Sequence, residues 1–150
     1  MKTASNIVSV QLPPKDLAAV KQKLEELKAL LDPHLVSLTP AERQMLPKMR
    51  DKTLPFVEKA MEYAQSRPNF TPPYLDVKEL TIDVKAVEDL TQVYRDVEQL
   101  CRNLDDTIML SGSEAYTASL TYYNSVKQAA KVNVPDAKAI YEDLRKRFEK

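Results

Sequence analysis

Apolar side chains recur at every third or fourth position through the middle of the chain, which places them on one face of an α-helix. This central stripe consists of Val77, Leu80, Val84, Val87, Leu90, Tyr94, Val97, Cys101, Leu104 and Ile108. Between Tyr74 and Val134 the chain has no proline and a single glycine, Gly112. The pattern predicts long helical structure, and we expect its stripe to be buried against other helices.

A second apolar stripe lies nearer the N-terminus, at positions separated alternately by three and four residues. It is formed by Leu17, Val20, Leu24, Leu27 and Leu31, with Lys and Glu between them. Pro13 and Pro14 favour a helix start, and Asp32-Pro33 favours its end. Residues 1–14 are predicted to form an extended arm, because Asn6–Leu12 alternates like a strand but has no strand to pair with.

Shorter signals mark the remaining helices. Thr39-Pro40-Ala41-Glu42 predicts a short helix, with a threonine N-cap and a glutamate that can reach back to it. A second main helix is predicted from Leu54 to Ser66, and Asp76 with Glu79 should cap the long one. Asn133-Val134-Pro135-Asp136 should begin a last helix. We expect its inward face to consist of Ala137, Ile140, Tyr141, Leu144 and Phe148.

The point at which the long helix turns has two alternatives. Ser111-Gly112-Ser113 offers a glycine that can adopt a left-handed conformation, followed by a serine cap, and is our first choice. The other is Asn103–Thr107, where Asp105, Asp106 and Thr107 could cap a new helix and leave Gly112 in a helix interior.

These elements together predict an all-α protein. We expect an antiparallel up-and-down bundle of four or five main helices, formed by residues 15–150 as a single domain, with a short extended N-terminal arm. The length of 150 residues and the hydrophobic content of 43% suit one such domain.

The charge of the chain restricts its partners. Its 22 basic and 22 acidic residues cancel, so nothing attracts phosphate backbones, and a nucleic-acid partner is not expected. No segment approaches the apolar length of a membrane span, so we expect a soluble, cytoplasmic protein without a membrane partner. Residues 74–131 are acidic overall, with mildly basic segments on either side, an arrangement that would suit antiparallel self-pairing or the bundle itself.

The inventory of catalytic groups is poor. His34 is the one histidine and adjoins a predicted helix end, while Cys101 falls on the central stripe, where we expect it in the core. Asp105 and Asp106 are consecutive, so on a helix they diverge too far to share a proton. A single glycine cannot build a phosphate-binding loop. We therefore assign no catalytic residue, no metal site and no cofactor, which disfavours an enzyme.

Tyrosines gather late in the chain and supply the candidate binding site. Tyr116 and Tyr123 share a helix face, Tyr122 points elsewhere, and Asn124 and Lys127 follow. Tyrosine is common both at the edges of cores and at interfaces. These five residues are the candidates for binding a ligand or a partner.

Several segments resemble a group of small bacterial helical proteins of unknown function. They are Leu38–Arg43, Pro72–Leu75, Asp106-Thr107, Gly112–Tyr116, Tyr122–Lys127 and Val134–Tyr141. The resemblance implies a bacterial cytoplasmic protein with a helical bundle. It assigns no activity and no functional residue.

Two functions follow as hypotheses. The first is a non-enzymatic helical bundle that acts through protein–protein contacts, with self-association as one form of them. The alternative is a protein, or an enzyme, that binds a small molecule in a tyrosine-lined cleft between helices.

Overall fold

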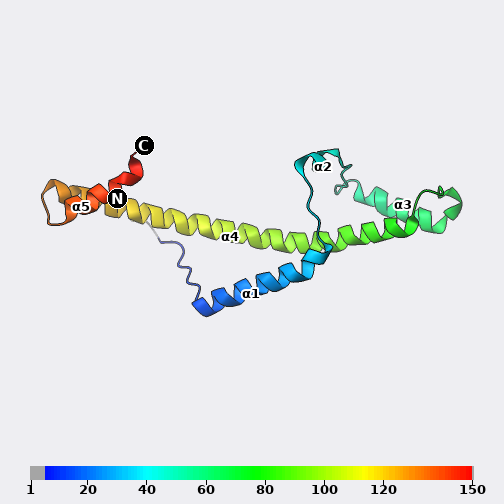
Figure 1. Ribbon diagram of the computed structural model, residues 1–150, viewed down its shortest axis with the longest axis horizontal. Coiled ribbons are helices and arrows are strands. Elements are labelled where there is room, and N and C mark those ends of the chain that lie inside the picture. The colour runs from blue at the N-terminus through cyan, green and yellow to red at the C-terminus, as the bar shows by residue number, and fades with distance from the viewer. Residues whose placement is uncertain (1–5, 150) are drawn as a thin grey trace. The chain divides into compact units, whose positions relative to one another are not determined.

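The computed structural model describes residues 6–149, and within this range it is helical without any strand (Figure 1). Its α-helices are α1 (Pro14–Leu31), α2 (Pro40–Met45), α3 (Leu54–Ser66), α4 (Val77–Lys131) and α5 (Ala137–Arg145). Short 3-10 helices cover Asp32–His34, Pro68–Phe70 and Lys146–Phe148. The all-α class is confirmed. Residues 6–12 of the predicted arm are not helical, and residues 1–5 of that arm lie outside the described range.

The chain divides into two compact units, and α4 runs through both of them. One unit is Pro13–Gln99, which contains α1, α2, α3 and the first part of α4. The other joins the arm to the chain from Leu100 onward, including the rest of α4 and α5.

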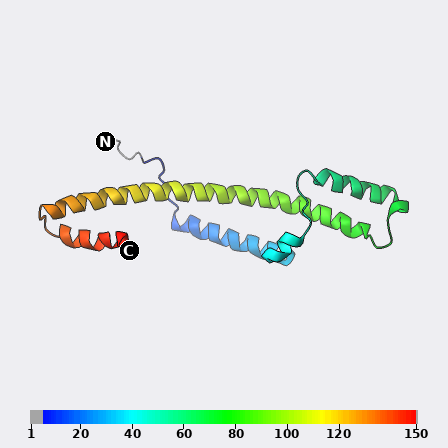
Figure 2. The same cartoon turned by 90° about the horizontal axis from the view of Figure 1, so that it is seen from above.

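In the unit Pro13–Gln99, α3 lies beside the start of α4 (Figures 1 and 2). The Gln65 side-chain amide donates a hydrogen bond of 3.0 Å to the Thr81 hydroxyl, and Val84, one turn further along α4, is 3% exposed. The apolar side chains of α3 that we take as its inner face are Val57, Met61 and Ala64, each half-buried. The helix boundaries agree with the predicted Leu54–Ser66.

Helix ends in this unit follow the predicted capping signals. The Glu42 backbone N–H donates to the Thr39 hydroxyl, and the Glu42 carboxylate accepts the Thr39 N–H at 2.7 Å, which completes a capping box. The hydrogen bonds that the Glu42 carboxylate accepts from Thr39 lower the pKa of Glu42, because they stabilise its charged form. Asp76 accepts from the N–H groups of Lys78 and Glu79 at 2.9 and 3.1 Å, so it caps α4 as expected.

Both predicted turning points of the long helix are wrong, since α4 is unbroken from Val77 to Lys131. Gly112 does not have a positive φ, and the Thr107 hydroxyl donates back to the Asn103 carbonyl within the helix at 2.6 Å. Asp105 and Asp106 therefore do not act as caps. One glycine costs a helix about 1 kcal/mol, which is too little to break it when the flanking residues support helix.

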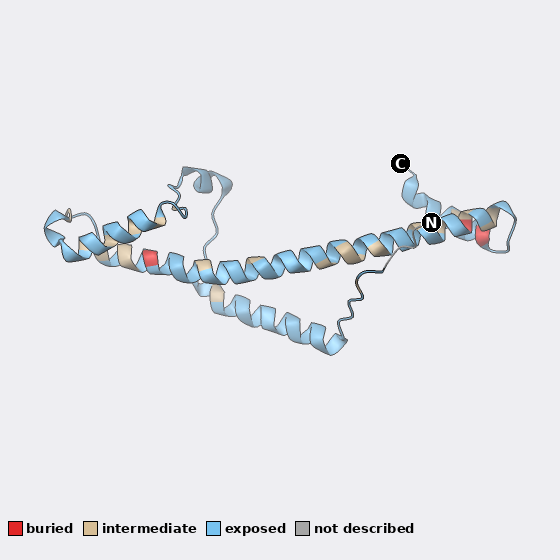
Figure 3. Cartoon of the chain, turned by 180° about the vertical axis from the view of Figure 1, so that it is seen from behind, coloured by how far each residue is buried: buried red, intermediate tan, exposed pale blue. Residues whose placement is uncertain are grey.

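The expectation that the apolar stripes are buried is also wrong for this chain. Leu24 on α1 is 44% exposed, Val87 on α4 is 41% exposed and Ile108 is 68% exposed. Cys101, expected in the core, is exposed as well. Figure 3 shows exposed residues along almost all of α1 and along the middle of α4. The buried apolar residues in the described part of the chain are Val84, Val126 and Ala137.

We expect Gly112→Ala to stabilise the protein by up to about 1 kcal/mol, because alanine is the better helix former. A Cβ atom at this position would meet no described atom within 4 Å apart from its chain neighbours and the backbone of its own helix turn. The change can be measured as the free energy of unfolding in denaturant. A destabilised variant would show that a backbone approaches residue 112 closely.

Candidate functional site

A tight turn after α4 creates a concave site in the unit that contains α5. The Val134 N–H donates to the Ala129 carbonyl at 3.1 Å, and the Asn133 N–H donates to the Ala130 carbonyl at 3.2 Å. Asn133 has a φ of 57°, so an asparagine takes the left-handed position that ends this type of helix. Asp136, with a φ of 66°, directly precedes α5, which begins at Ala137. The turn sends the chain back along α4.

Aromatic rings hold α5 and the following 3-10 helix against α4. The Tyr123 ring stacks on that of Tyr141, with centroids 5.6 Å apart, and its centroid lies 5.2 Å from that of the Phe148 ring. Val126 and Ala137 are 8% and 6% exposed, so they form the small core of this helical hairpin. Aromatic pairs of this kind stabilise the folded state by about 0.5–1.5 kcal/mol in addition to the contribution of their buried area.

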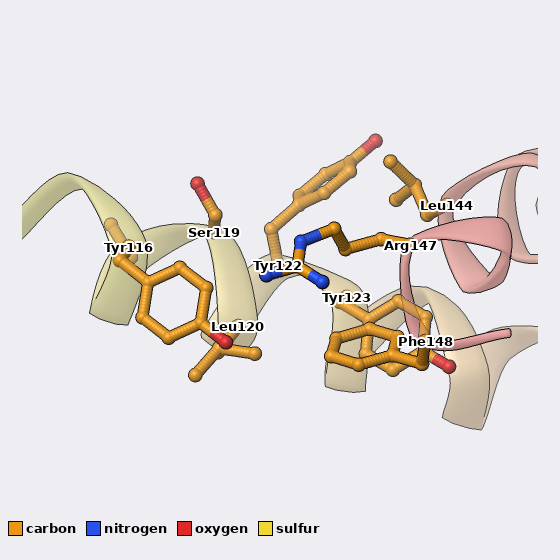
Figure 4. Close-up of a pocket in the computed structure, with 9 residues that line it drawn as sticks. Tyr116, Ser119, Leu120, Tyr122, Tyr123, Leu144, Arg147 and Phe148 are labelled. Atoms are coloured by element: carbon orange, nitrogen blue, oxygen red, sulfur yellow. The ribbon is translucent and has the colours of Figure 1, made fainter. Parts of the chain in front are cut away.

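A groove of about 530 Å³ opens between α4 and the chain that returns along it (Figure 4). We call it the aromatic groove. Its lining residues are Tyr116, Ala118, Ser119, Leu120, Tyr122, Tyr123, Leu144, Arg147 and Phe148. Its volume lies within the range of small-molecule sites, and its walls are largely apolar.

The basic residues near the groove differ in whether they are paired with an acidic side chain. Arg145 pairs with Glu149 at 3.2 Å, and Lys146 pairs with Asp143 at 3.1 Å. Arg147 forms no ion pair or hydrogen bond through its side chain with any residue from 6 to 149, and Figure 4 shows its guanidinium directed toward α4. No acidic side chain lines the groove. Its one charge is therefore a cation without a partner among the residues that the structure describes.

Three of the five predicted site residues line the aromatic groove. They are Tyr116, Tyr122 and Tyr123. Asn124 and Lys127 are on the same helix but are not part of the lining, so the structure does not bring all five together.

Sequence reasoning did not assign Arg147 and Phe148 to this site. Phe148 was on the predicted inner face of the last helix, which was the available signal. Arg147 belongs to a basic run at a helix C-terminus, where favourable interaction with the helix dipole already explains a cation.

The Tyr123 hydroxyl has a pKa raised above its ordinary value. Desolvation beneath the neighbouring rings is the main cause, and the hydroxyl of Tyr141 adds to it, while the nearby Arg145 charge opposes the shift. Desolvation disfavours the phenolate, so the neutral form is favoured in the folded chain. At neutral pH Tyr123 is a neutral wall of the groove and not a base.

A second surface of interest is the apolar face of α4, which we call the α4 seam. From Val87 to Ile108 its main positions alternate by three and four residues, the spacing of helices that pack side by side. Val93 and Leu100 widen it on one edge and are 38% and 52% exposed. A wide face of this kind is typical of a helix that contacts more than one neighbour.

The arm lies on a continuation of this seam where the side chains become small. Val8 and Val10 of the arm and Ser111, Ala115 and Ala118 of α4 border the same concave surface. The Ile7 N–H donates to the Glu114 carboxylate at 2.6 Å. Small residues let an extended backbone approach, so the arm lies beside this stretch, where Ser111 is half-buried and Ala115 and Ala118 are exposed. The arm does not reach the larger seam residues.

Other chemistry finds no support in the described part of the chain. From residue 6 to 149, no three His, Cys, Asp or Glu side chains gather as metal ligands would. No helix in that range has the length and apolarity needed to cross a membrane.

Comparison of the chain with models of protein families, with characterised proteins and with solved structures found no match.

The raised pKa of Tyr123 predicts a loss of stability at alkaline pH. Above pH 10 the unfolded chain releases this proton before the folded chain does, so the stabilisation is present below that pH and is lost as pH rises through the folded pKa. We expect the free energy of unfolding to fall over this range, and less steeply in Tyr123→Phe, which keeps the ring. Chemical denaturation at several pH values measures both slopes.

Tyr74→Phe is the matched control, because Tyr74 is 91% exposed. It should reproduce the slope of the wild-type chain. Identical slopes for wild type and Tyr123→Phe would contradict the assignment.

Proposed function

We propose that the protein is a non-enzymatic helical protein that acts through protein–protein contacts, and that its first partner is a second copy of itself. In this proposal the exposed faces of α1 and α4 from two copies complete an antiparallel helical bundle. The bundle predicted from the sequence would then be formed between chains.

The observation that carries this proposal is the exposure of the α4 seam. Leu104 is 54% exposed and Leu100 is 52% exposed, although both occupy apolar positions of a regularly patterned helix. A long helix is stabilised mainly by burying such a face and only slightly by intrinsic propensity. Full burial of one leucine contributes about 1.5–3 kcal/mol, so covering the seam would release substantial free energy.

Charge favours a second copy as the occupant of the seam. The chain carries no net charge, so two copies do not repel each other as like-charged bodies would. Lys21 flanks the apolar stripe of α1, whereas Asp105 flanks the α4 seam. Edges of opposite sign support pairing of α1 with α4 of another copy.

The spacing of the two stripes supports the same pairing. The stripe of α1, from Leu17 to Leu31, and the α4 seam both alternate by three and four residues. Helices with this common period can keep their apolar faces in contact along their length. On α1 the stripe is open too, with Val20 47% exposed.

The test is Leu104→Glu, measured by sedimentation equilibrium. We expect wild type to have at least twice the monomer mass of 17.1 kDa at micromolar concentration. The variant should associate at least about 100-fold more weakly, because burying a carboxylate costs several kcal/mol and about 1.4 kcal/mol is a factor of ten.

Gln99→Glu is the matched control, since Gln99 is on the face of α4 opposite the seam and is exposed. It introduces the same charge and should associate like wild type. A monomeric wild type that is fully helical at micromolar concentration would contradict the proposal, as would equal association of the two variants.

The bacterial origin and cytoplasmic location implied by the sequence are part of this proposal. Self-association of the chain is compatible with this origin and location but does not depend on them. The small-molecule hypothesis depends on a different surface, the aromatic groove.

A further inference from the structure

The aromatic groove differs from the α4 seam in having depth, a cation and hydroxyl groups in one place. We propose that it binds a small anionic ligand with a flat apolar body, an aromatic carboxylate being the chemical class. This inference does not depend on self-association, because the groove is formed within one unit of the chain.

The apolar walls of the groove select the body of the ligand. Tyr116 and Tyr122 are more than half exposed, and Phe148, which also contacts the Tyr123 ring, is 51% exposed, so parts of these three rings stay accessible along the groove. Leu120 and Leu144 complete the apolar lining. Aromatic side chains prefer stacked or edge-to-face partners, so a flat ring fits these walls better than a branched chain.

The charge of the groove selects the other end of the ligand. Arg147 is the only charged side chain in its lining, and its guanidinium has no partner among residues 6–149. A guanidinium presents a planar pair of N–H groups that matches a carboxylate with two parallel hydrogen bonds. Arg145 and Lys146, its basic neighbours, already pair with acidic side chains. Arg147 is thus the group available for an anion.

Rigid support makes this arrangement a site and not a chance gathering of side chains. The Tyr123 ring contacts the rings of both Tyr141 and Phe148, and the turn at Asn133 fixes the return of the chain toward α4. Rings held in advance lose little conformational freedom when a ligand binds. The groove therefore needs no large rearrangement to accept one.

The test uses 2-naphthoate as the probe and fluorescence anisotropy as the measurement. The chain has no tryptophan, so the probe can be excited at wavelengths that tyrosine does not absorb. We expect saturable binding of 2-naphthoate to the full chain and binding at least about tenfold weaker to Arg147→Gln, a loss of about 1.4 kcal/mol. The neutral 2-naphthamide should bind as weakly to wild type as naphthoate does to the variant.

Two control variants test whether the loss of binding is specific to Arg147. Arg43→Gln removes an exposed arginine of the other unit and should bind naphthoate like wild type. Leu104→Glu disrupts the α4 seam and should also retain binding, because the seam is not part of the groove. Circular dichroism of Arg147→Gln should match wild type, since Arg147 is exposed.

Absence of saturable binding below about 1 mM, a range weaker than ordinary specific affinity, would overturn the proposal. Equal binding to wild type and Arg147→Gln would do the same, since it would place the probe on a general apolar surface. If Arg147→Gln weakened self-association and left naphthoate binding unchanged, the groove would belong to a contact between copies and the proposal would be wrong.

Discussion

Burial of the apolar face of α4 is the requirement on which the rest of this chain depends. Ordering a residue costs about 1–2 kcal/mol of backbone entropy, and helical hydrogen bonds alone offset little of it in water. Val84 and Val126 are buried close to the contacts that α3 and α5 make with α4, Gln65 with Thr81 and Tyr141 with Tyr123. Between them, the seam from Val87 to Ile108 stays open to solvent. In the proposed function, a second copy of the chain supplies the cover for that seam.

The caps and turns at the helix ends described here form their hydrogen bonds within one chain, without such a cover. The capping box at Thr39, the Asp76 cap and the turn at Asn133 each supply partners to helix-end groups that would otherwise be unpaired. Surface ion pairs such as Lys85 with Asp89 add little, because solvent screens them. These features fix where helices begin and end, whereas the cover for the α4 seam would come from another chain.

Sequence patterns predicted the local structure of the chain more accurately than they predicted how its helices pack. Leu54–Ser66 and the caps at Thr39 and Asp76 depend on nearest neighbours, and the sequence contains that information. The break at Gly112 was wrong because a glycine permits a turn but does not require one. Cys101 was placed in a core because periodicity identifies the apolar face and is silent about what covers it.

The candidate site likewise has a part that local sequence predicts and a part that depends on how the chain packs. Tyr116, Tyr122 and Tyr123 are close in sequence, and local clustering was enough to select them. Arg147 and Phe148 reach the groove only because the turn at Asn133 reverses the chain, so no local pattern pairs them with the tyrosines.

The dependence of the melting temperature on protein concentration tests the central claim most directly. If folding requires a second copy to cover the α4 seam, the melting temperature should rise steadily over a concentration increase of about 100-fold, because association stabilises the folded state by mass action. A melting temperature that stays constant over that range, with a cooperative transition at every concentration, would contradict the account.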